Sequence, residues 1–322
     1  MHMADALVSA PVAVSAGVVA AALIVVASKK VARIKRDDIL PLMGVMGAFV
    51  FAAQMINFSI PGTGSSGHII GGVLLAALLG PWAAFITIAS VLIIQCLIFA
   101  DGGLMALGCN LINMGAMSCL VAWPLVYRPI AGKTFRKGRV FLASVAACVV
   151  GLELGALLVT GETELSGITS LPPSEFLLFM LPIHLAIGLC EGVATGAVLC
   201  FVGSYKPDML YEADHVAAAG KSGKMTRRTK TVIGVFAALA LVMAVSFTWI
   251  ASSDPDGLEW SISRLTGSTE LAPAVTPATA IMPDYDSTFA GVLGGLIVVA
   301  LLWGFCSILF RKAQSRKNAE KL

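Results

Sequence analysis

The first two residues of the chain, Met1-His2, offer three nitrogen atoms that a single metal ion could bind. These are the α-amine, the backbone nitrogen of His2 and the imidazole of His2, and adjacent chelate rings would hold them near one plane. A fourth nitrogen would complete a square-planar set, the geometry that suits Ni(II) or Cu(II). A histidine in second position can also arise by chance, so the hypothesis requires a fourth donor on the same side of the protein.

His68 is the candidate for that fourth donor. It ends a Gly- and Ser-rich loop that reads Pro61-Gly62-Thr63-Gly64-Ser65-Ser66-Gly67-His68. Glycines let a backbone bend close to a ligand, and loops often carry binding residues. A loop histidine taken alone is more often a hydrogen-bonded polar group than a ligand, so its role depends on Met1-His2 lying on the same face. We therefore take Met1, His2 and His68 as the candidate metal ligands.

The composition predicts an all-α integral membrane protein. Of the 322 residues, 57% are hydrophobic and 13% are charged, against about 25% charged in soluble domains, and the mean hydropathy is +0.88. The seven cysteines form no CxxC pair and lie mostly in apolar runs, so we expect small buried hydrophobes rather than disulfides. No basic residue precedes Lys29, which argues against a signal peptide. The large side chain of His2 favours a retained Met1, since methionine removal generally requires a small second residue. The net charge of +3 gives no reason to expect a nucleic-acid partner.

Nine apolar segments follow one another, seven and then two, and we expect each to be helical. They are approximately Pro11–Ser28, Ile39–Ile56, Ile69–Leu79, Trp82–Ala100, Leu104–Tyr127, Val140–Thr160, Phe176–Gly203, Thr231–Ala251 and Thr288–Phe310. The third is too short to cross about 30 Å of hydrocarbon alone. The predicted organisation is a seven-helix domain over residues 1–203, a basic cytoplasmic linker over 204–230, and a two-helix domain over 231–322 with an extracytoplasmic loop over 252–287.

The basic residues predict the orientation. Four stretches hold all but one of the 22 Lys and Arg residues: Lys29–Arg36, Arg128–Arg139, Lys206–Lys230 and Arg311–Lys321. The positive-inside rule then predicts a multi-pass protein of the cytoplasmic (inner) membrane, with the N-terminus extracytoplasmic and the C-terminus cytoplasmic. This requires the segments on either side of Gly80-Pro81 to cross the membrane twice. It also places His2 and His68 on the same, outer face.

Six motifs within residues 1–203 agree in order and spacing with one known family. They are Met1-His2-Met3-Ala4-Asp5, the loop that ends at His68, Leu79-Gly80-Pro81-Trp82, Phe99-Ala100-Asp101-Gly102-Gly103-Leu104, Gly108-Cys109-Asn110-Leu111-Ile112-Asn113-Met114, and His184-Leu185-Ala186-Ile187-Gly188 with Glu191-Gly192. Together they resemble the nickel/cobalt substrate-binding (S) components of energy-coupling-factor transporters, of the CbiM/NikM type. The resemblance implies that Met1, His2 and His68 hold the metal. Met3-Ala4 departs from the usual apolar-Pro pair and Ala6 from a common Gly, which bears on how the N-terminal segment turns.

The C-terminal part has its own marker, Asp254-Pro255-Asp256-Gly257-Leu258-Glu259. It resembles the PDGLE (NikN-type) module, a two-helix accessory component of nickel uptake systems. This module and a planar set of four nitrogens favour Ni²⁺ over Co²⁺ as the transported ion, with cobalt uptake as the alternative. The resemblance further implies a separate transmembrane coupling (T) subunit and ATPase (A) subunits, so the chain itself is not expected to be an enzyme. Gly132-Lys133-Thr134 and Gly220-Lys221-Ser222 lack the first glycine of a phosphate-binding loop, which agrees with separate ATPase chains.

Other polar and small residues are candidates for supporting roles. Asp5, Ser66 and Asp101 could orient the histidines, or cap helices and face water. His184 and Glu191 lie two turns apart on one face of an apolar helix, where interhelical packing or coupling is expected before metal contact. The stripe Ala13, Gly17 and Ala21 permits close helix approach, either to a neighbouring helix of this chain or to the coupling subunit.

Two other classes of protein remain as alternatives. An ATP-independent divalent-metal permease should carry ionisable residues at bilayer depth along a path, and the candidates here are Glu153, His184 and Glu191. An intramembrane metallohydrolase should show an HExxH motif or a similar pair of ligands on a helix. The sequence contains no such motif.

Overall fold

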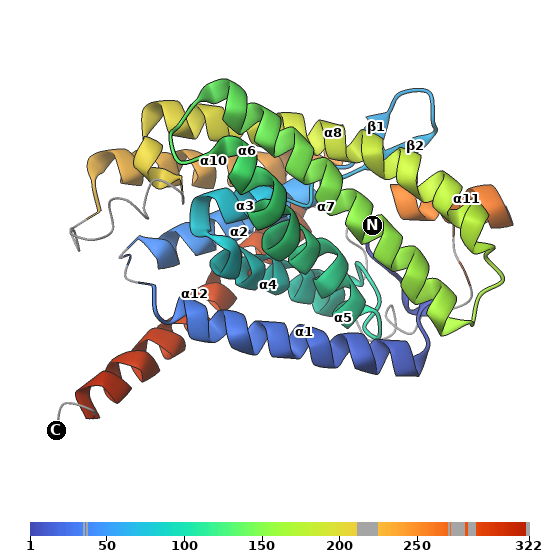
Figure 1. Ribbon diagram of the computed structural model, residues 1–322, viewed down its shortest axis with the longest axis horizontal. Helices are drawn as coiled ribbons and strands as arrows, with labels where there is room; N and C mark the ends of the chain where they lie inside the picture. The colour runs from blue at the N-terminus through green and yellow to red at the C-terminus, as the bar shows by residue number, and fades with distance from the viewer. Residues whose placement is uncertain are drawn as a thin grey trace.

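A computed structural model describes residues 1–34, 36, 38–210, 225–269, 271, 281–282 and 288–319. Each of the nine apolar segments is helical in it, so the predicted all-α membrane class is confirmed (Figure 1). The helices of the first domain are α1 (Ala10–Val31), α2 (Ile39–Gln54), α3 (Gly72–Leu79), α4 (Pro81–Phe99), the continuous unit α5 (Leu107–Asn110), η2 (Leu111–Tyr127) and α6 (Arg128–Ala131), α7 (Lys137–Ser166) and α8 (Pro173–Tyr205). The second domain contributes α10 (Arg227–Ile250) and α12 (Thr288–Ala319).

Helix length divides these nine segments into two groups. Within the described residues, seven helices are long and apolar enough to cross a membrane, while α2 has 16 residues and α3 has 8. Gly80, with φ of 82°, ends α3, and Pro81 begins α4, because proline fits the first turn of a helix and glycine the left-handed region. The predicted break at Gly80-Pro81 is therefore present, and the double crossing remains a prediction.

Helices α7 and α8 pack closely along a row of glycines. A Cβ at Gly188, Gly192 or Gly196 of α8 would lie within 3.0 Å of an atom of Val149, Val145 or Phe141 of α7. Small residues at four-residue spacing let two helices approach in this way. On the opposite side of the bundle, α1 lies along one edge (Figure 1), with Ala16, Ala20 and Ala27 on its buried face.

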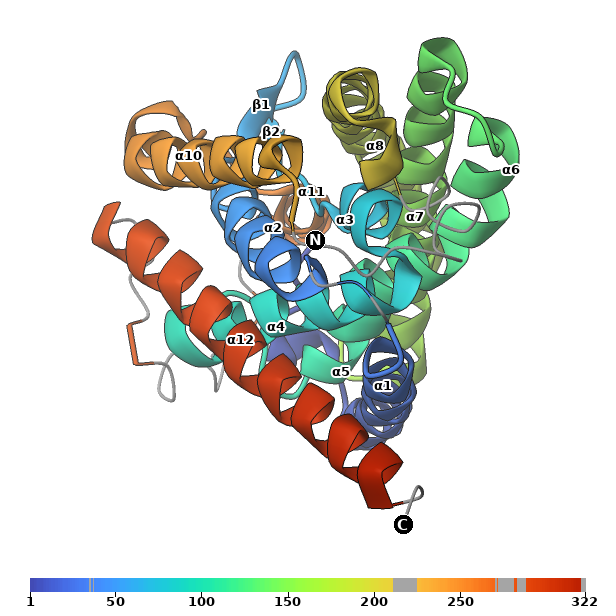
Figure 2. The same cartoon turned by 90° about the vertical axis from the view of Figure 1, so that its left-hand side faces the viewer.

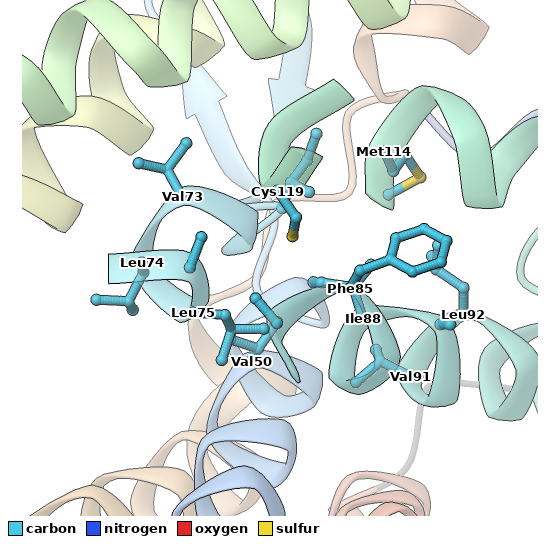
Figure 3. Close-up of a cluster of buried hydrophobic side chains, with 14 of the residues drawn as sticks. Val50, Val73, Leu74, Leu75, Phe85, Ile88, Val91, Leu92, Met114 and Cys119 are labelled. Carbon is cyan, nitrogen blue, oxygen red and sulfur yellow. The ribbon is translucent and has the colours of Figure 1, made fainter. Parts of the chain in front are cut away.

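The centre of the bundle is a dry core around α3 and α4. Figure 3 shows side chains from α2, α3, α4 and η2 that meet there. The labelled members are Val50, Val73, Leu74, Leu75, Phe85, Ile88, Val91, Leu92, Met114 and Cys119, all of them buried. This packing buries α3 on every side, which explains how so short a helix is stable.

The second domain packs on the first through α2. Helix α12 runs diagonally past α2 and α4 (Figure 2). A Cβ at Gly47 of α2 would lie 2.8 Å from Leu302, and one at Gly294 of α12 would lie 2.1 Å from Phe51, so small residues set this interface as well. Helix α8 extends to Tyr205 and α10 begins at Arg227, so both helices include residues of the predicted linker 204–230. Residues 211–224 lie outside the described residues.

Two predicted loops contain short elements of their own. Strands β1 (Phe58–Ile60) and β2 (Ser65–Gly67) form an antiparallel hairpin ahead of His68. The 252–287 loop contains helix α11 (Gly257–Thr266), which Asp256 caps. Figure 1 shows α11 beside α8 and near β2, so a segment of the second domain reaches the loop that carries His68.

Candidate metal centre

The N-terminal residues are held inside the protein by the segment that leads into α5. The Met1 side chain is 4% exposed and packs where a Cβ at Gly155 of α7 would lie 2.6 Å from its Cε. Asn110 of α5 accepts a hydrogen bond from the Met3 N–H at 2.8 Å and donates one to the Met3 carbonyl at 3.1 Å. The Gly103 N–H also donates to that carbonyl at 2.9 Å. The terminal amine therefore has a defined position.

The amine lies between one group from each domain. Its nitrogen is 3.2 Å from Nε2 of His68 and 2.6 Å from Oδ2 of Asp256, with which it forms an ion pair. The imidazoles of His2 and His68 stack, with centroids 5.0 Å apart and an interplanar angle of 23°. The three residues predicted as ligands thus meet at one point, together with one carboxylate that was not predicted.

His2 contacts two acceptors through its two ring nitrogens. Nδ1 lies 3.1 Å from Oδ1 of Asp101, and Nε2 lies 3.3 Å from Oε1 of Gln95. Gln95 of α4 donates to Oε1 of Gln54 at 2.8 Å, and Gln54 of α2 donates to the carbonyl of Ile70 at 2.8 Å. A chain of buried amides therefore links His2 to the loop that carries His68.

Contacts on two sides fix that loop. From within the first domain, Glu191 of α8 accepts hydrogen bonds from the N–H groups of Ile70 and Gly71, both at 2.9 Å. From the second domain, the carbonyl of Pro255 accepts from the Ser66 N–H at 2.8 Å, and the indole N–H of Trp260 donates to the Thr63 carbonyl at 3.0 Å.

Burial and charge shape the titration of the centre. Burial lowers the pKa of His2 despite nearby Asp101, and burial together with the terminal ammonium lowers the pKa of His68 well below its ordinary value. Both rings are therefore neutral at pH 7 and can donate a lone pair. Burial alone would raise the pKa of Asp256, but the neighbouring terminal ammonium outweighs it and holds that pKa well below its usual range. Burial, and then Asp256, raises the pKa of Glu259 to about 6.

The spacing suits a small square-planar ion. Neighbouring nitrogens about 2.0 Å from one metal lie about 2.8 Å apart at a right angle, and the amine and His68 Nε2 are already 3.2 Å apart. Within the described residues, no three His, Cys, Asp or Glu side chains gather as a metal site. Two main-chain nitrogens lie here as well, the amine of Met1 and the amide of His2.

The three residues predicted to orient the histidines, Asp5, Ser66 and Asp101, contact three different groups. Asp101 contacts His2. Asp5 instead accepts hydrogen bonds from the N–H groups of Met105 and Ala106 at 2.8 and 3.2 Å, and the Ser66 hydroxyl donates to the Asp254 carbonyl at 2.7 Å.

The two candidate residues of α8, His184 and Glu191, have different partners. His184 is fully buried and its Nδ1 donates to the Met180 carbonyl at 2.8 Å, while its ring lies against Gly257. Glu191 binds the loop backbone as described above. In the small-residue stripe of α1, Ala13 and Gly17 are half-buried and Ala21 is exposed, and all three line a groove with Leu107 and Gly108 of α5.

Three residues at the centre were not predicted from the sequence: Asp256, Gln54 and Gln95. Asp256 had a visible signal, because Asp256-Gly257-Leu258-Glu259 has the spacing of a capping box, and the structure forms that box. Gln54 and Gln95 are amides inside apolar helices, which is itself a signal, since a buried amide needs partners. Their mutual contact depends on tertiary structure.

Comparison with known proteins identifies the family. The model of the CbiM family, described as a cobalt uptake substrate-specific transmembrane region, matches residues 2–209. The chain belongs to the CbiM family. A second model, the PDGLE domain, matches residues 230–311, so the resemblance drawn from the motifs is confirmed for both domains. As a CbiM-family member, the chain is a membrane component of transition-metal transport.

Relatives of this CbiM-family chain include proteins named for nickel transport and for cobalt transport. A protein of Archaeoglobus fulgidus, provisionally named as the fused nickel transport protein NikMN, is 33% identical over 84% of this chain and 86% of its own length. The fused nickel transport protein NikMN of Rhodobacter capsulatus is 28% identical over 86% and 79%. The cobalt transport protein CbiM of Geobacter sulfurreducens is 28% identical over 76% and 71%. A crystal structure of a transition metal transporter matches with a TM-score of 0.58 and 29% identity, covering 68% of this chain and 100% of that one.

Proposed function

We propose that this chain captures extracytoplasmic Ni²⁺ as the substrate-binding component of an ATP-driven energy-coupling-factor importer. The ion would be held by the Met1 amine, the backbone nitrogen and Nδ1 of His2, and Nε2 of His68. The observation that carries the proposal is the meeting of the terminal amine with His68 at 3.2 Å beside the stacked ring of His2. Only Nδ1 of His2 can close a six-membered ring with its own amide, so the fourth position falls to His68.

The remaining parts of the proposal follow from this role. The N-terminus faces outward, the C-terminus is cytoplasmic, and separate T and A subunits supply the coupling and the ATP hydrolysis. Four nitrogens in a plane favour Ni²⁺ over Co²⁺, because Co²⁺ is less committed to that geometry. Cobalt is the second candidate, and the description of the family model as a cobalt uptake region supports it.

The experiment is a metal titration of the purified full chain in lipid nanodiscs, with the tag at the C-terminus and Met1 verified by mass spectrometry. We expect one Ni²⁺ per chain with the absorption band of square-planar Ni(II), and weaker binding of Co²⁺. H68A and two added Gly residues before Met1 should each abolish the band, while H184A, which changes a buried histidine outside the donor set, should retain it. Equal binding by the extended chain would contradict the proposal, and rapid nickel uptake by the chain alone in vesicles without ATP would favour the permease.

A further inference from the structure

Two buried glutamines connect His2 to the loop that carries His68. Gln95 is fully buried and Gln54 is 3% exposed. The connection runs from Nε2 of His2 to Oε1 of Gln95, then from Nε2 of Gln95 to Oε1 of Gln54, and finally from Nε2 of Gln54 to the carbonyl of Ile70. It therefore joins His2 to the backbone two residues beyond His68.

The last member of this chain fixes the direction of every bond in it. The Ile70 carbonyl can only accept, so the amide nitrogen of Gln54 must face it. Oε1 of Gln54 then accepts from the amide nitrogen of Gln95, which leaves Oε1 of Gln95 facing the imidazole. An oxygen in that position requires a hydrogen on Nε2 of His2.

The Ile70 peptide is held firmly enough to act as the end of the chain. Its N–H, and that of Gly71, donate to the two oxygens of Glu191 at 2.9 Å each. Gly71 has φ of 80°, a conformation that favours glycine. Glu191 is 1% exposed, so the carbonyl direction is set by buried contacts from α8.

From these contacts we propose that Gln95 is a positioning residue for metal capture, which holds the proton of His2 on Nε2 and so presents the lone pair of Nδ1 to the metal. Gln54 and Glu191 support it by anchoring the relay to the His68 loop. The inference rests on the proposed function for its consequence, but not for the tautomer itself. A metal-binding histidine commonly donates its other ring N–H to such a partner, and removing the partner typically costs about 10–100-fold in affinity.

Asp101 is the competing partner of His2, because its carboxylate faces Nδ1 at 3.1 Å. A neutral ring carries one hydrogen and can serve one of the two acceptors. Asp101 is 27% exposed and can replace the imidazole with water at little cost. Gln95 is fully buried, and losing a buried hydrogen bond costs about 1 kcal/mol or more. The balance favours the hydrogen on Nε2.

Nitrogen NMR of the metal-free protein tests the tautomer directly. The full chain is labelled with ¹⁵N-histidine, placed in lipid nanodiscs at about pH 8, where histidine is neutral, and the His2 signals are assigned by comparison with H2A. We expect the wild-type proton on Nε2. A proton on Nδ1 would overturn the inference, whether or not the protein binds nickel. Failure of the wild type to bind nickel would instead count against the proposed function.

Variants of Gln95 test the consequence. Q95L should give mixed tautomers and about 10–100-fold weaker Ni²⁺ binding. Q95E keeps an oxygen toward His2 and should restore the Nε2 tautomer, with affinity between those of Q95L and the wild type. T87V, which removes a buried hydroxyl of α4 that bonds to its own helix, is the matched control and should match the wild type. Wild-type tautomer and affinity in Q95L would overturn the inference; if Q95L does not fold, the wild-type spectrum and Q95E still decide it.

Discussion

The His68 loop is held on two sides, and the two sides differ in kind. On the inner side, Glu191 and Gln54 bind the backbone of Ile70 and Gly71 from α8 and α2, within the first domain, and both side chains are buried. On the outer side, the segment 254–260 of the second domain binds Ser66 and Thr63, and Asp256 pairs with the amine. We call these the inner and outer clamps.

The two clamps differ in what they control: the inner clamp controls the backbone of the His68 loop, and the outer clamp controls access to the site. The inner clamp uses buried acceptors on helices, so it fixes the backbone at His68 whether or not the second domain is docked. The outer clamp includes Asp256 and Trp260, both of which are partly exposed. We infer that the second domain acts on the amine and on the entry to the site, while the first domain sets the geometry of the donors.

The largest effect should come from breaking the inner clamp. E191L leaves the N–H groups of Ile70 and Gly71 without their acceptors, and at about 1–3 kcal/mol for each the free energy of unfolding should fall by about 4 kcal/mol. E191Q keeps one acceptor oxygen and should lose about half of that. Unfolding by SDS titration with a far-UV circular dichroism readout measures both. Equal stability of E191L and the wild type would mean that Glu191 does not anchor the loop.

Breaking the outer clamp at Asp256 should have the next largest effect. Oδ2 of Asp256 binds the amine, and Oδ1 accepts from the N–H groups of Leu258 and Glu259 at 2.8 and 2.9 Å. D256A removes both roles and should cost about 3 kcal/mol, of which the cap accounts for about 1 kcal/mol. D256N keeps the cap and should cost about 2 kcal/mol. The same unfolding assay compares the two variants. Identical losses in free energy of unfolding would show that the helix cap contributes nothing measurable.

The pH dependence of nickel binding tests the amine, where the two clamps meet. Burial lowers the pKa of His2 and of His68 from 6.5, so both rings are neutral between pH 8 and 6.5 and release no protons there. The amine and the amide must lose protons to bind the ion. Affinity should therefore fall as the pH falls through this window, by at least about 30-fold for one proton per ion. Isothermal titration in several buffers measures the slope and the protons released, and a flat profile would exclude proton release by the amine and by the amide.

The smallest effect should come from the close contact of α11 with α8. A Cβ at Gly257 would lie 3.0 Å from Ile187 and 3.2 Å from His184, so G257A should loosen the outer clamp by about 1 kcal/mol. G234A is the matched control, since a Cβ there meets nothing within 4 Å and alanine favours a helix by about 0.5–1 kcal/mol. Limited proteolysis between residues 252 and 269 measures the loosening. A protected G257A would show that α8 yields to the added methyl group.

Hydropathy and charge were sufficient to predict the helices, because most apolar runs are long and basic stretches or Gly80-Pro81 separate several of them. Helix α11 was not predicted, because its ten residues are of mixed polarity and do not resemble a membrane span. The only sequence signal for this helix is the capping box that begins at Asp256. The candidate ligands Met1, His2 and His68 could be proposed from donor chemistry and motif resemblance. Asp256, Gln54 and Gln95 could not, because their roles come from contacts between residues 41 to 255 positions apart.

The ion pair between the first residue and Asp256 also sets an order of assembly. The two groups are 255 positions apart, so the pair can form only after 256 of the 322 residues have been synthesised. Contacts that close so long a loop form late in folding. A nascent chain that ends before Asp256 therefore exposes its amine without the carboxylate, and the centre is completed near the end of biogenesis although its first donor is made first.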